Sequence, residues 1–318
     1  MTEQFKRNNP YRLLQFLSQQ PIQLSRFFAR ALAGFVNLLK VSKTSENIRL
    51  NLKIALPELD DAAREKITRA AIRNELTAYF EFFNIWGTDN QQNIARIENI
   101  FGEALIHEAL QENKGLVLIV PHFGTWEIMN AYLAQFTQMT IMYKPVKNAA
   151  VNQFVLAARS REQANLVPTD ESGVRQIFKA LKTGGTTVIL PDHSPHHSSE
   201  LIPYFGIPLS SSNLSAKLIQ KTKAKALLLY AMRNKNGHFD MHVEAMDDAI
   251  YEGTANDATE IIHQHLEQLI RRYPEHYHWS YKRFRAHPKL RRIYNQSPEK
   301  SLMQIQAVRE EYQSSFID

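Results

Sequence analysis

Gly115-Leu-Val-Leu-Ile-Val-Pro-His-Phe-Gly-Thr-Trp-Glu127 is the most informative stretch of this 318-residue chain. Five apolar residues follow the first glycine, and a histidine, a second glycine and a glutamate come after them. A continuous apolar run of this length, bounded by turn-forming residues, is typical of a strand buried on both faces of a sheet. Open α/β sheets gather their functional side chains just beyond the carboxyl ends of such strands. We therefore look for the chemistry of the protein in residues 121–127, and in residues 144–145 and 191–193, which follow later strands.

Further strands and helices are expected on both sides of this stretch. Four other segments have strand character, and they are residues 140–143, 187–190, 226–231 and 239–244. Helical periodicity is found between and around them, in residues 60–87, 126–136, 151–163, 174–181, 213–222 and 261–273. Apolar strands that alternate with helices predict an α/β fold with a mostly parallel central sheet and helices on both faces. The helical first hundred residues add an N-terminal layer.

The composition limits the possible functions. The chain is 44% hydrophobic and 22% charged, which is typical of a globular protein. Because it has no cysteine, disulfides, thiolate metal sites and a cysteine nucleophile are excluded. The chain has 38 basic and 32 acidic residues, which gives a net charge of +6. This charge favours polyanionic partners but does not distinguish membranes from nucleic acids.

The N-terminal segment has the character of a membrane-associating helix. Residues 22–39 are the most apolar part of it, but Arg26 and Arg30 interrupt them, so that a spanning helix is not expected. Together with Arg12 and Lys40, these arginines could face anionic headgroups while the apolar residues enter the membrane interface. The alternative is an ordinary amphipathic helix packed on the protein. We divide the chain into a membrane-associating amphipathic segment, residues 1–45, and a main domain, residues 46–318.

His122 and Glu127 form the strongest candidate pair for catalysis. An imidazole titrates near neutral pH, and a carboxylate on its second nitrogen fixes the tautomer and stabilises the imidazolium. Residues five apart do not share a face of a helix. The two side chains can therefore meet only if His122 lies in a turn, which Gly124 would permit, and Glu127 in the first helical turn. The alternative is a structural histidine followed by a glutamate that the helix dipole favours.

This His-x4-acid pattern resembles the glycerolipid acyltransferase superfamily, and glutamate as the acid is similar to the lipid A biosynthesis acyltransferases, the lauroyl/myristoyl transferases of Gram-negative bacteria. Further ordered blocks resemble the same family over about residues 45–285. They are Asn47-Ile48-Arg49 with Asn51 and Ala55-Leu56-Pro57, Tyr143-Lys144-Pro145 with Arg159-Ser160-Arg161, Leu190-Pro191-Asp192 with Pro203-Tyr204-Phe205-Gly206-Ile207-Pro208, and residues 267–279. Tyr204 departs from the phenylalanine usual in the family, and the common N-terminal transmembrane helix is not evident.

The resemblance implies a late acyltransferase of lipid A biosynthesis whose acyltransferase domain is residues 46–318. Such an enzyme transfers a lauroyl or myristoyl chain from acyl carrier protein to a hydroxyl of a Kdo-lipid A precursor. In this scheme His122 is the general base and Glu127 orients it. The developing oxyanion would be stabilised by Lys144, Arg159 and the backbone N–H groups that follow His122. We expect no cofactor besides the donor thioester, and no metal.

The acceptor in this scheme is a phosphorylated glycolipid. Arginine binds phosphate with two parallel hydrogen bonds, so Arg159 and Arg161 are the first candidates to hold it, followed by Arg49 and Asn51. Asp192 either supports the catalytic residues from behind or caps the following turn. The histidines of residues 193–197 could suggest a metal site, but Pro195 and the neighbouring serines favour an exposed polar loop.

The expected partners are acyl carrier protein, the phosphorylated glycolipid and an anionic membrane surface, and nucleic acid is not expected. The resemblance implies the cytoplasmic face of the bacterial inner membrane, with peripheral or monotopic attachment. Two basic runs, residues 221–225 and 282–292, are either solvated surface or a landing patch for carrier protein or anionic headgroups. A lysophospholipid or another glycolipid is the alternative acceptor. A non-catalytic basic protein that binds membranes or nucleic acid is a more distant alternative.

Overall fold

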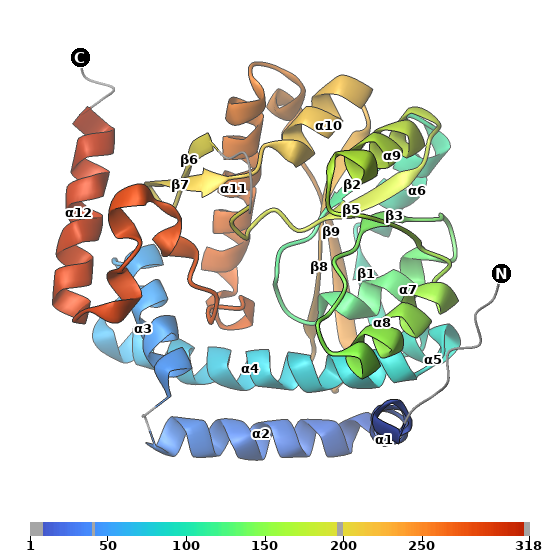
Figure 1. The fold of residues 1–318 in the computed structure, drawn as a ribbon, viewed down its shortest axis with the longest axis horizontal. Helices are drawn as coiled ribbons and strands as arrows, with labels where there is room; N and C mark the ends of the chain where they lie inside the picture. The colour runs from blue at the N-terminus through green and yellow to red at the C-terminus, as the bar shows by residue number, and fades with distance from the viewer. Residues whose placement is uncertain (1–8, 40–41, 196–199, 315–318) are drawn as a thin grey trace.

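The computed structural model describes residues 9–39, 42–195 and 200–314, and it arranges them around one central sheet (Figure 1). The five strands lie in the order β1 (Ile97–Phe101), β9 (Phe239–Ala245), β8 (Lys225–Arg233), β2 (Leu116–Ile119) and β5 (Thr186–Ile189). Neighbouring strands run parallel except β8 and β9, which are antiparallel. The predicted α/β fold with a mostly parallel sheet and a helical N-terminal region is confirmed.

Strand β2 lies in the interior of this sheet, and its four side chains are fully buried. They alternate between two hydrophobic clusters, with Val117 and Ile119 in one and Leu116 and Leu118 in the other. The first cluster includes side chains of α9 (Glu171–Lys182), α10 (Leu214–Thr222) and α11 (Ala255–Arg272). The second includes side chains of α6 (Glu103–Gln111) and α7 (Met129–Leu133). Because both faces are covered, the strand is apolar at every position.

Some strands differ from the prediction. The expected strand at residues 140–143 is β3 (Thr140–Met142), but it pairs with β4 (Asn165–Val167) in a separate two-stranded sheet. A hairpin of β6 (Glu200–Tyr204) and β7 (Ile207–Ser211) forms a third sheet. Neither β4, the hairpin nor β1 was predicted. β1 and β4 are short and partly exposed, so that neither carries a continuous apolar run.

The remaining helices lie around this core. They are α1 (Asn9–Ser18), α2 (Ile22–Leu39), α3 (Lys43–Ala55), α4 (Asp61–Gly87), α5 (Asn90–Ile94), α8 (Ala149–Arg161) and α12 (Pro298–Ser314). The helix expected at residues 126–136 is shorter than predicted, because it starts as the 3₁₀ turn η1 (Trp126–Ile128) and continues as α7. Further 3₁₀ turns are η2 (Asp248–Tyr251), η3 (Pro274–His276), η4 (Arg283–Ala286), η5 (Pro288–Leu290) and η6 (Ile293–Asn295).

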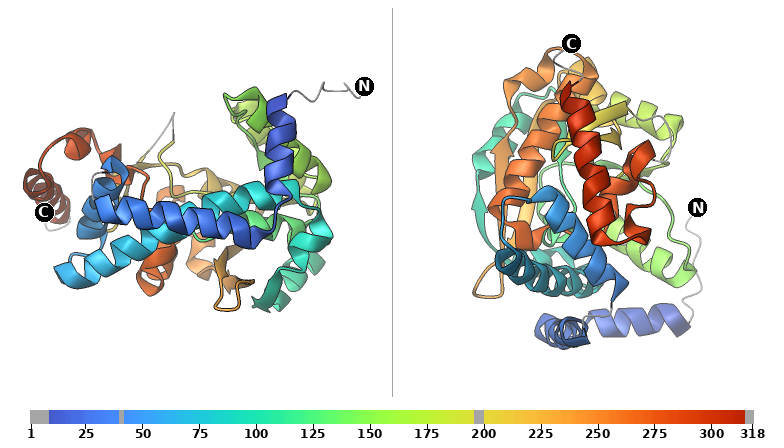
Figure 2. Two further views of the ribbon diagram at one scale, coloured as in Figure 1. Left: turned by 90° about the horizontal axis from the view of Figure 1, so that it is seen from below. Right: turned by 90° about the vertical axis from the view of Figure 1, so that its left-hand side faces the viewer.

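Helix α2 lies lengthwise against α4 and forms the outermost layer of the molecule (Figure 2). Its inner face buries Ile22, Arg26, Ala29 and Ala33. Ten large apolar side chains of α1 and α2 are exposed instead, and they are Leu13, Phe16, Leu17, Leu24, Phe27, Phe28, Leu32, Phe35, Leu38 and Leu39. In the described ranges, no helix combines the length and the apolar character needed to cross a bilayer.

A buried ion cluster joins this layer to the core. Glu81 of α4 is fully buried and accepts hydrogen bonds from Arg26 Nε at 2.6 Å, from Arg233 Nε at 2.7 Å and from Thr125 Oγ1 at 2.8 Å. Burial would raise the pKa of Glu81, but the hydrogen bonds and charges of the two arginines hold it below its usual value. The expectation that Arg26 faces lipid headgroups is therefore wrong, while Arg30 is exposed and Lys40 lies outside the described residues.

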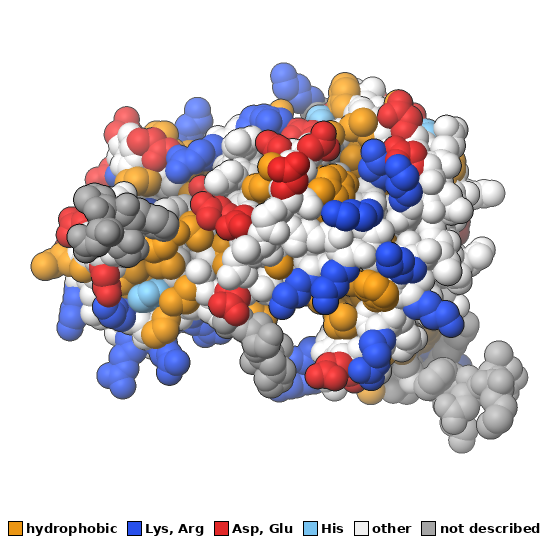
Figure 3. Space-filling view, turned by 90° about the horizontal axis from the view of Figure 1, so that it is seen from above, with side chains coloured by type: hydrophobic (Ala, Val, Ile, Leu, Met, Phe, Trp, Pro, Cys, Tyr) orange, Lys and Arg blue, Asp and Glu red, His pale blue; other side chains and the backbone are white. Residues whose placement is uncertain are grey.

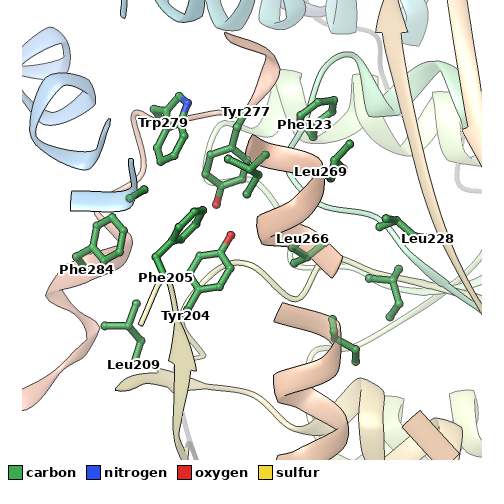
Figure 4. Close-up of a cluster of buried hydrophobic side chains, with 14 of the residues drawn as sticks. Phe123, Tyr204, Phe205, Leu209, Leu228, Leu266, Leu269, Tyr277, Trp279 and Phe284 are labelled. Atoms are coloured by element: carbon green, nitrogen blue, oxygen red, sulfur yellow. The ribbon is translucent and has the colours of Figure 1, made fainter. Parts of the chain in front are cut away.

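Aromatic side chains from three distant segments meet in one buried cluster (Figure 4). Phe123 follows β2, Tyr204 and Phe205 come from the β6–β7 hairpin, and the segment after α11 contributes Tyr277 and Trp279. The hydroxyl groups of Tyr204 and Tyr277 point toward each other in this view. The cluster fastens the segment after α11 to the carboxyl end of β2.

We expect Glu81→Ala to lower the free energy of unfolding by about 3–5 kcal/mol, because two buried guanidinium groups would lose their counter-charge. Chemical denaturation monitored by circular dichroism measures this loss. Glu311→Ala is the matched control, since Glu311 forms an exposed pair with Lys289 and its removal should change stability little. Equal stability of the Glu81→Ala variant and the native protein would show that the cluster does not hold the N-terminal layer.

Candidate active site

The loop after β2 is held by backbone hydrogen bonds on two sides. Gly124 has a φ of +56°, and a Cβ atom at this position would lie 2.0 Å from the carbonyl oxygen of Ala231. Its N–H group donates to His276 O at 2.8 Å, and the N–H group of His278 donates to His122 O at 3.0 Å. Only glycine tolerates this conformation and this approach, so the bend predicted at Gly124 is confirmed.

His122 projects from this loop onto the carboxylate of Asp192, which follows β5. The distance from Nδ1 of His122 to Oδ1 of Asp192 is 2.9 Å, and the backbone N–H of His122 donates to Oδ2 at 3.1 Å. The hydroxyl of Tyr277 donates to the same Oδ2 at 3.2 Å. When Nδ1 carries the proton of this hydrogen bond, Nε2 is left as a proton acceptor. The His122 side chain is 22% exposed, so a substrate can reach it.

Asp192 is fully buried and remains ionised. Burial alone would raise the pKa of Asp192, but the charge of His122 and the hydrogen bond to its ring hold the pKa well below the usual value. An ionised carboxylate on Nδ1 orients the imidazole and stabilises the imidazolium that forms when Nε2 takes a proton.

The ring of His193 lies flat against the ring of His122. The two centroids are 3.7 Å apart at an interplanar angle of 3°, and Tyr281 stacks on the other face of His193, also at 3.7 Å. Burial lowers the pKa of His193 to about 4, and the charge of His122 contributes to this shift, so His193 is neutral at pH 7. The three-ring stack fixes the plane of the His122 imidazole.

His122, Asp192 and His193 bring possible metal ligands within 4.8 Å of one another. The two imidazoles are parallel, however, so their in-plane lone pairs point side by side instead of toward one centre. Nδ1 of His122 is also engaged by Asp192. This arrangement fits a stacked pair better than a coordination site. His196 and His197 lie outside the described residues.

Three cavities adjoin this stack. The apolar cavity, about 700 Å³, is lined by His122 and His193 and by Ile141, Met142, Ile177, Val188, Ile189, Leu190 and Leu214, among others. The histidine cavity, about 350 Å³, shares His122 and His193 with it and is also lined by Tyr79, His278, Ser280, Tyr281, Lys282 and Arg285. The basic cavity, about 550 Å³, shares Tyr281 and Arg285 with the histidine cavity and adds Arg291. The His122–Asp192 pair thus lies where an apolar space meets a polar one.

Comparisons with known proteins identify the family of this chain. The sequence model described as bacterial lipid A biosynthesis acyltransferase matches residues 11–286. The chain belongs to this family. It is similar to the lipid A biosynthesis palmitoleoyltransferase of Escherichia coli K12, with 23% identity over 251 residues, which cover 77% of this chain and 80% of the relative. It is also similar to the lipid A biosynthesis lauroyltransferase of the same organism, with 22% identity over 80% of this chain and 83% of the relative.

The spacing of Glu127 from His122 predicts that the two side chains meet, but in the structure Glu127 does not contact the His122 ring. Its carboxylate accepts hydrogen bonds from Arg159 Nη2 at 2.8 and 2.9 Å and from Trp86 Nε1 at 2.8 Å. The partner of the His122 ring is Asp192. The expected orientation of His122 by Glu127 is therefore corrected: η1 begins before residue 127, and this turn directs the carboxylate toward α4 and α8 instead.

Arg159 is also placed differently from the prediction. Its guanidinium group is nearly buried between Glu127 and Glu162, with Nη1 2.9 Å from Glu162. Burial would lower the pKa of Arg159, but the two carboxylates raise it above its usual value. Because its charge is already neutralised by the protein, Arg159 is a structural cation, and the expected phosphate and oxyanion contacts are not supported.

The backbone N–H groups after His122 are likewise engaged. Phe123 N–H donates to Pro121 O at 2.8 Å, Gly124 to His276 O at 2.8 Å and Thr125 to Ala231 O at 3.0 Å. The expectation that they stabilise an oxyanion is therefore wrong in this conformation. Lys144 is exposed and lines the apolar cavity together with His122.

The other predicted phosphate-binding residues lie away from the three cavities. Arg161 is exposed on α8 and donates to the carbonyl of Trp86. Arg49 forms an ion pair with Glu65 at 2.9 Å. Asn51 is buried, and its amide donates to Trp279 O at 2.7 Å and to Tyr281 O at 2.9 Å, so it holds the wall of the histidine cavity in place.

Sequence reasoning missed the parts of the site that come from the last third of the chain. Tyr277 contacts Asp192 and Tyr281 stacks on His193. Tyr277 lies in the block of residues 267–279, but the motif does not indicate which residue it contacts. The position of His193 directly after β5 places it at the same sheet edge as His122, whereas the sequence favours a polar loop there and does not predict the ring stacking.

Glu75 lies behind Ser280, a residue of the histidine cavity wall, and accepts hydrogen bonds from the Ser280 hydroxyl and from its N–H group at 3.2 Å. Burial raises the pKa of Glu75 from 4.5 to about 7, although the bonds from Ser280 oppose this shift. The folded protein therefore holds a proton on Glu75 that the unfolded chain loses above pH 4.5. The contribution of the protonated Glu75 to the stability of the fold is fully present below pH 4.5, and it is lost as the pH rises to about 7.

We expect Glu75→Gln to remove this pH dependence. The native protein should lose about 3 kcal/mol more than the variant between pH 4.5 and 7, because one pKa unit corresponds to about 1.4 kcal/mol. Denaturation midpoints measured across this range for both proteins provide the comparison. Parallel curves would contradict a protonated Glu75.

Proposed function

We propose that this chain transfers an acyl group from an acyl carrier protein thioester to a hydroxyl group of a phosphorylated lipid A precursor, with His122 as the general base. The single observation that carries the proposal is the His122–Asp192 pair at the junction of the apolar cavity and the histidine cavity. Membership in the family and the names of the relatives support the choice of reaction and acceptor.

The apolar cavity suits the acyl chain of the donor. Most of its apolar lining residues come from β3, β5, α9 and α10, and loop residues such as Leu190 and Pro191 complete the wall. Burying each methylene group is worth about 0.8 kcal/mol. The relatives are named for lauroyl and palmitoleoyl groups at nearly the same identity, so they leave the chain length open. We take a chain of the lauroyl or myristoyl class as the first donor to test.

The reaction proceeds in one ternary complex without an acyl-enzyme. Nε2 of His122 takes the proton of the acceptor hydroxyl as its oxygen attacks the thioester carbonyl carbon, and a tetrahedral oxyanion forms. The oxyanion collapses, the C–S bond breaks, and the leaving thiolate receives the proton from the imidazolium. The products are an ester and the free thiol of the carrier protein.

Lys144 is the residue we assign to the oxyanion. It is the lysine that shares the apolar cavity with His122, and its position lets its charge act where the thioester carbonyl would enter. A positive charge that faces developing negative charge lowers the barrier most where water is excluded.

The exposed apolar face of α1 and α2 suits attachment to the membrane in which the lipid substrate resides. Arg12 and Arg30 are exposed on the same helices, and anionic headgroups attract such residues. We therefore propose peripheral or monotopic association at the cytoplasmic face of the inner membrane.

The catalytic pair is tested with Asp192→Asn and Glu127→Gln. We expect Asp192→Asn to lower kcat by about 10²-fold or more and to move the midpoint of the pH–rate profile to lower pH, because the imidazolium loses its carboxylate. Glu127→Gln should lower the rate through Arg159 but leave the midpoint unchanged. Turnover of lauroyl-carrier protein with a purified lipid A precursor is the measurement, and thermal melting shows that each variant is folded.

The reverse pattern would overturn the role of Asp192. If the midpoint of the pH–rate profile moved in Glu127→Gln and stayed unchanged in Asp192→Asn, Glu127 and not Asp192 would be the residue that orients His122. Acylation of lysophospholipids but not of the lipid A precursor would overturn the proposed acceptor.

Membrane attachment is tested with the double variant Phe28→Asp and Phe35→Asp. Both side chains are more than half exposed, so the fold should tolerate the changes. Sedimentation with vesicles of phosphatidylglycerol and phosphatidylethanolamine should show at least about tenfold weaker binding, since burying one phenylalanine is worth about 1.5–3 kcal/mol. Met303→Asp, at an exposed position on α12, is the control. Unchanged binding of the double variant would exclude this face as the attachment surface.

A further inference from the structure

Basic side chains concentrate in the two cavities that adjoin the catalytic histidine on its polar side. Lys282 and Arg285 line the histidine cavity, and Arg285 and Arg291 line the basic cavity. Among the described residues that line these two cavities there is no aspartate or glutamate. Burial lowers the pKa of His193, His278 and His287 in these walls, and the permanent positive charge of the lining comes from the three cations.

These three cations differ from Lys289, a basic residue of the same segment. Within the described part of the chain, Lys282, Arg285 and Arg291 form no ion pair with a carboxylate, whereas Lys289 of the same segment pairs with Glu311. On the face shown in Figure 3, lysine and arginine side chains are interspersed with acidic ones, so the positive charge does not form one uniform patch there. The lack of a carboxylate partner therefore distinguishes these cavity cations from Lys289 of the same segment.

The backbone that carries the cations is fixed. Arg283 is buried and donates to Ser210 O at 2.8 Å and to Ser194 Oγ at 3.1 Å, which ties this segment to β7 and to the loop after β5. Phe284 and Leu290 are buried in the core. The turns η4 and η5 thus present Arg285 and Arg291 from a rigid support, which reduces the entropic cost of binding.

We propose that Lys282, Arg285 and Arg291 form an anion subsite that binds a phosphate group of the acceptor lipid and thereby places its hydroxyl beside His122. The inference rests on the proposed function, which it deepens by assigning the acceptor side of the site. Arginine binds phosphate through two parallel hydrogen bonds, and lysine adds a point charge. A cavity receives a sugar phosphate more readily than the convex surface of an acidic protein, and for this reason we favour the acceptor over docking of the carrier protein.

The test compares Arg285→Gln and Arg291→Gln with Arg292→Gln. Arg292 is exposed in the same segment and lines neither cavity, so its variant loses the same charge. With a phosphorylated lipid A precursor, KM for the acceptor should rise about tenfold in each of the first two variants, as expected for a lost charge-assisted hydrogen bond. With the phosphatase-treated precursor, all variants should resemble the native enzyme.

Two outcomes would overturn the subsite. One is an unchanged acceptor KM in Arg285→Gln and Arg291→Gln, and the other is a rise in KM for the carrier protein donor alone, which would assign these cations to donor docking. If the native protein acylates neither form of the precursor, the proposed function fails by itself. In that case, binding of glucosamine 1-phosphate, measured by calorimetry, still decides the subsite. Binding that Arg285→Gln weakens and Arg292→Gln preserves supports it, and equal binding by both variants refutes it.

Discussion

The carboxylate of Asp192 is the point on which the site depends. It accepts hydrogen bonds from the ring and the backbone of His122 and from the hydroxyl of Tyr277. These contacts join the loops after β2 and β5 to the segment after α11, which are far apart in the chain. A buried carboxylate is costly unless it is fully hydrogen-bonded, so these partners keep Asp192 ionised and fix their own positions at the same time. The imidazole of His122 is therefore oriented by the same contacts that close the fold.

Two other buried carboxylate clusters stabilise the region around the catalytic loop. Glu81 ties Thr125 to α2 and β8 through Arg26 and Arg233. Glu127 ties η1 to α8 through Arg159. In both clusters each charged side chain forms an ion pair with an opposite charge of the protein. Lys144 on the apolar side and Arg285 on the polar side lie in the walls of the cavities.

This division of charges fits the chemistry of an amphipathic substrate. An acyl chain requires an apolar space, whereas a phosphorylated sugar requires cations without carboxylate partners. The His122–His193–Tyr281 stack forms part of the boundary between the two spaces. The exposed apolar face of α1 and α2 gives the molecule a second amphipathic surface, on which Arg26 is not available to headgroups because Glu81 holds it inside.

The sequence by itself determined the α/β class, the bend at Gly124 and the position of His122, because these follow from local rules. A doubly buried strand must be apolar throughout, and a backbone with positive φ must be glycine. The ordered motifs also led to the family that the comparisons show. Only the tertiary structure decided the partner of His122. Glu127 and Asp192 are both acids that follow strands of the sheet, and the choice between them depends on the direction of η1, on Arg159 and on Tyr277. The same holds for β3, which has the pattern of a central strand but pairs with β4, since strand pairing is a long-range contact that the pattern within one strand does not record.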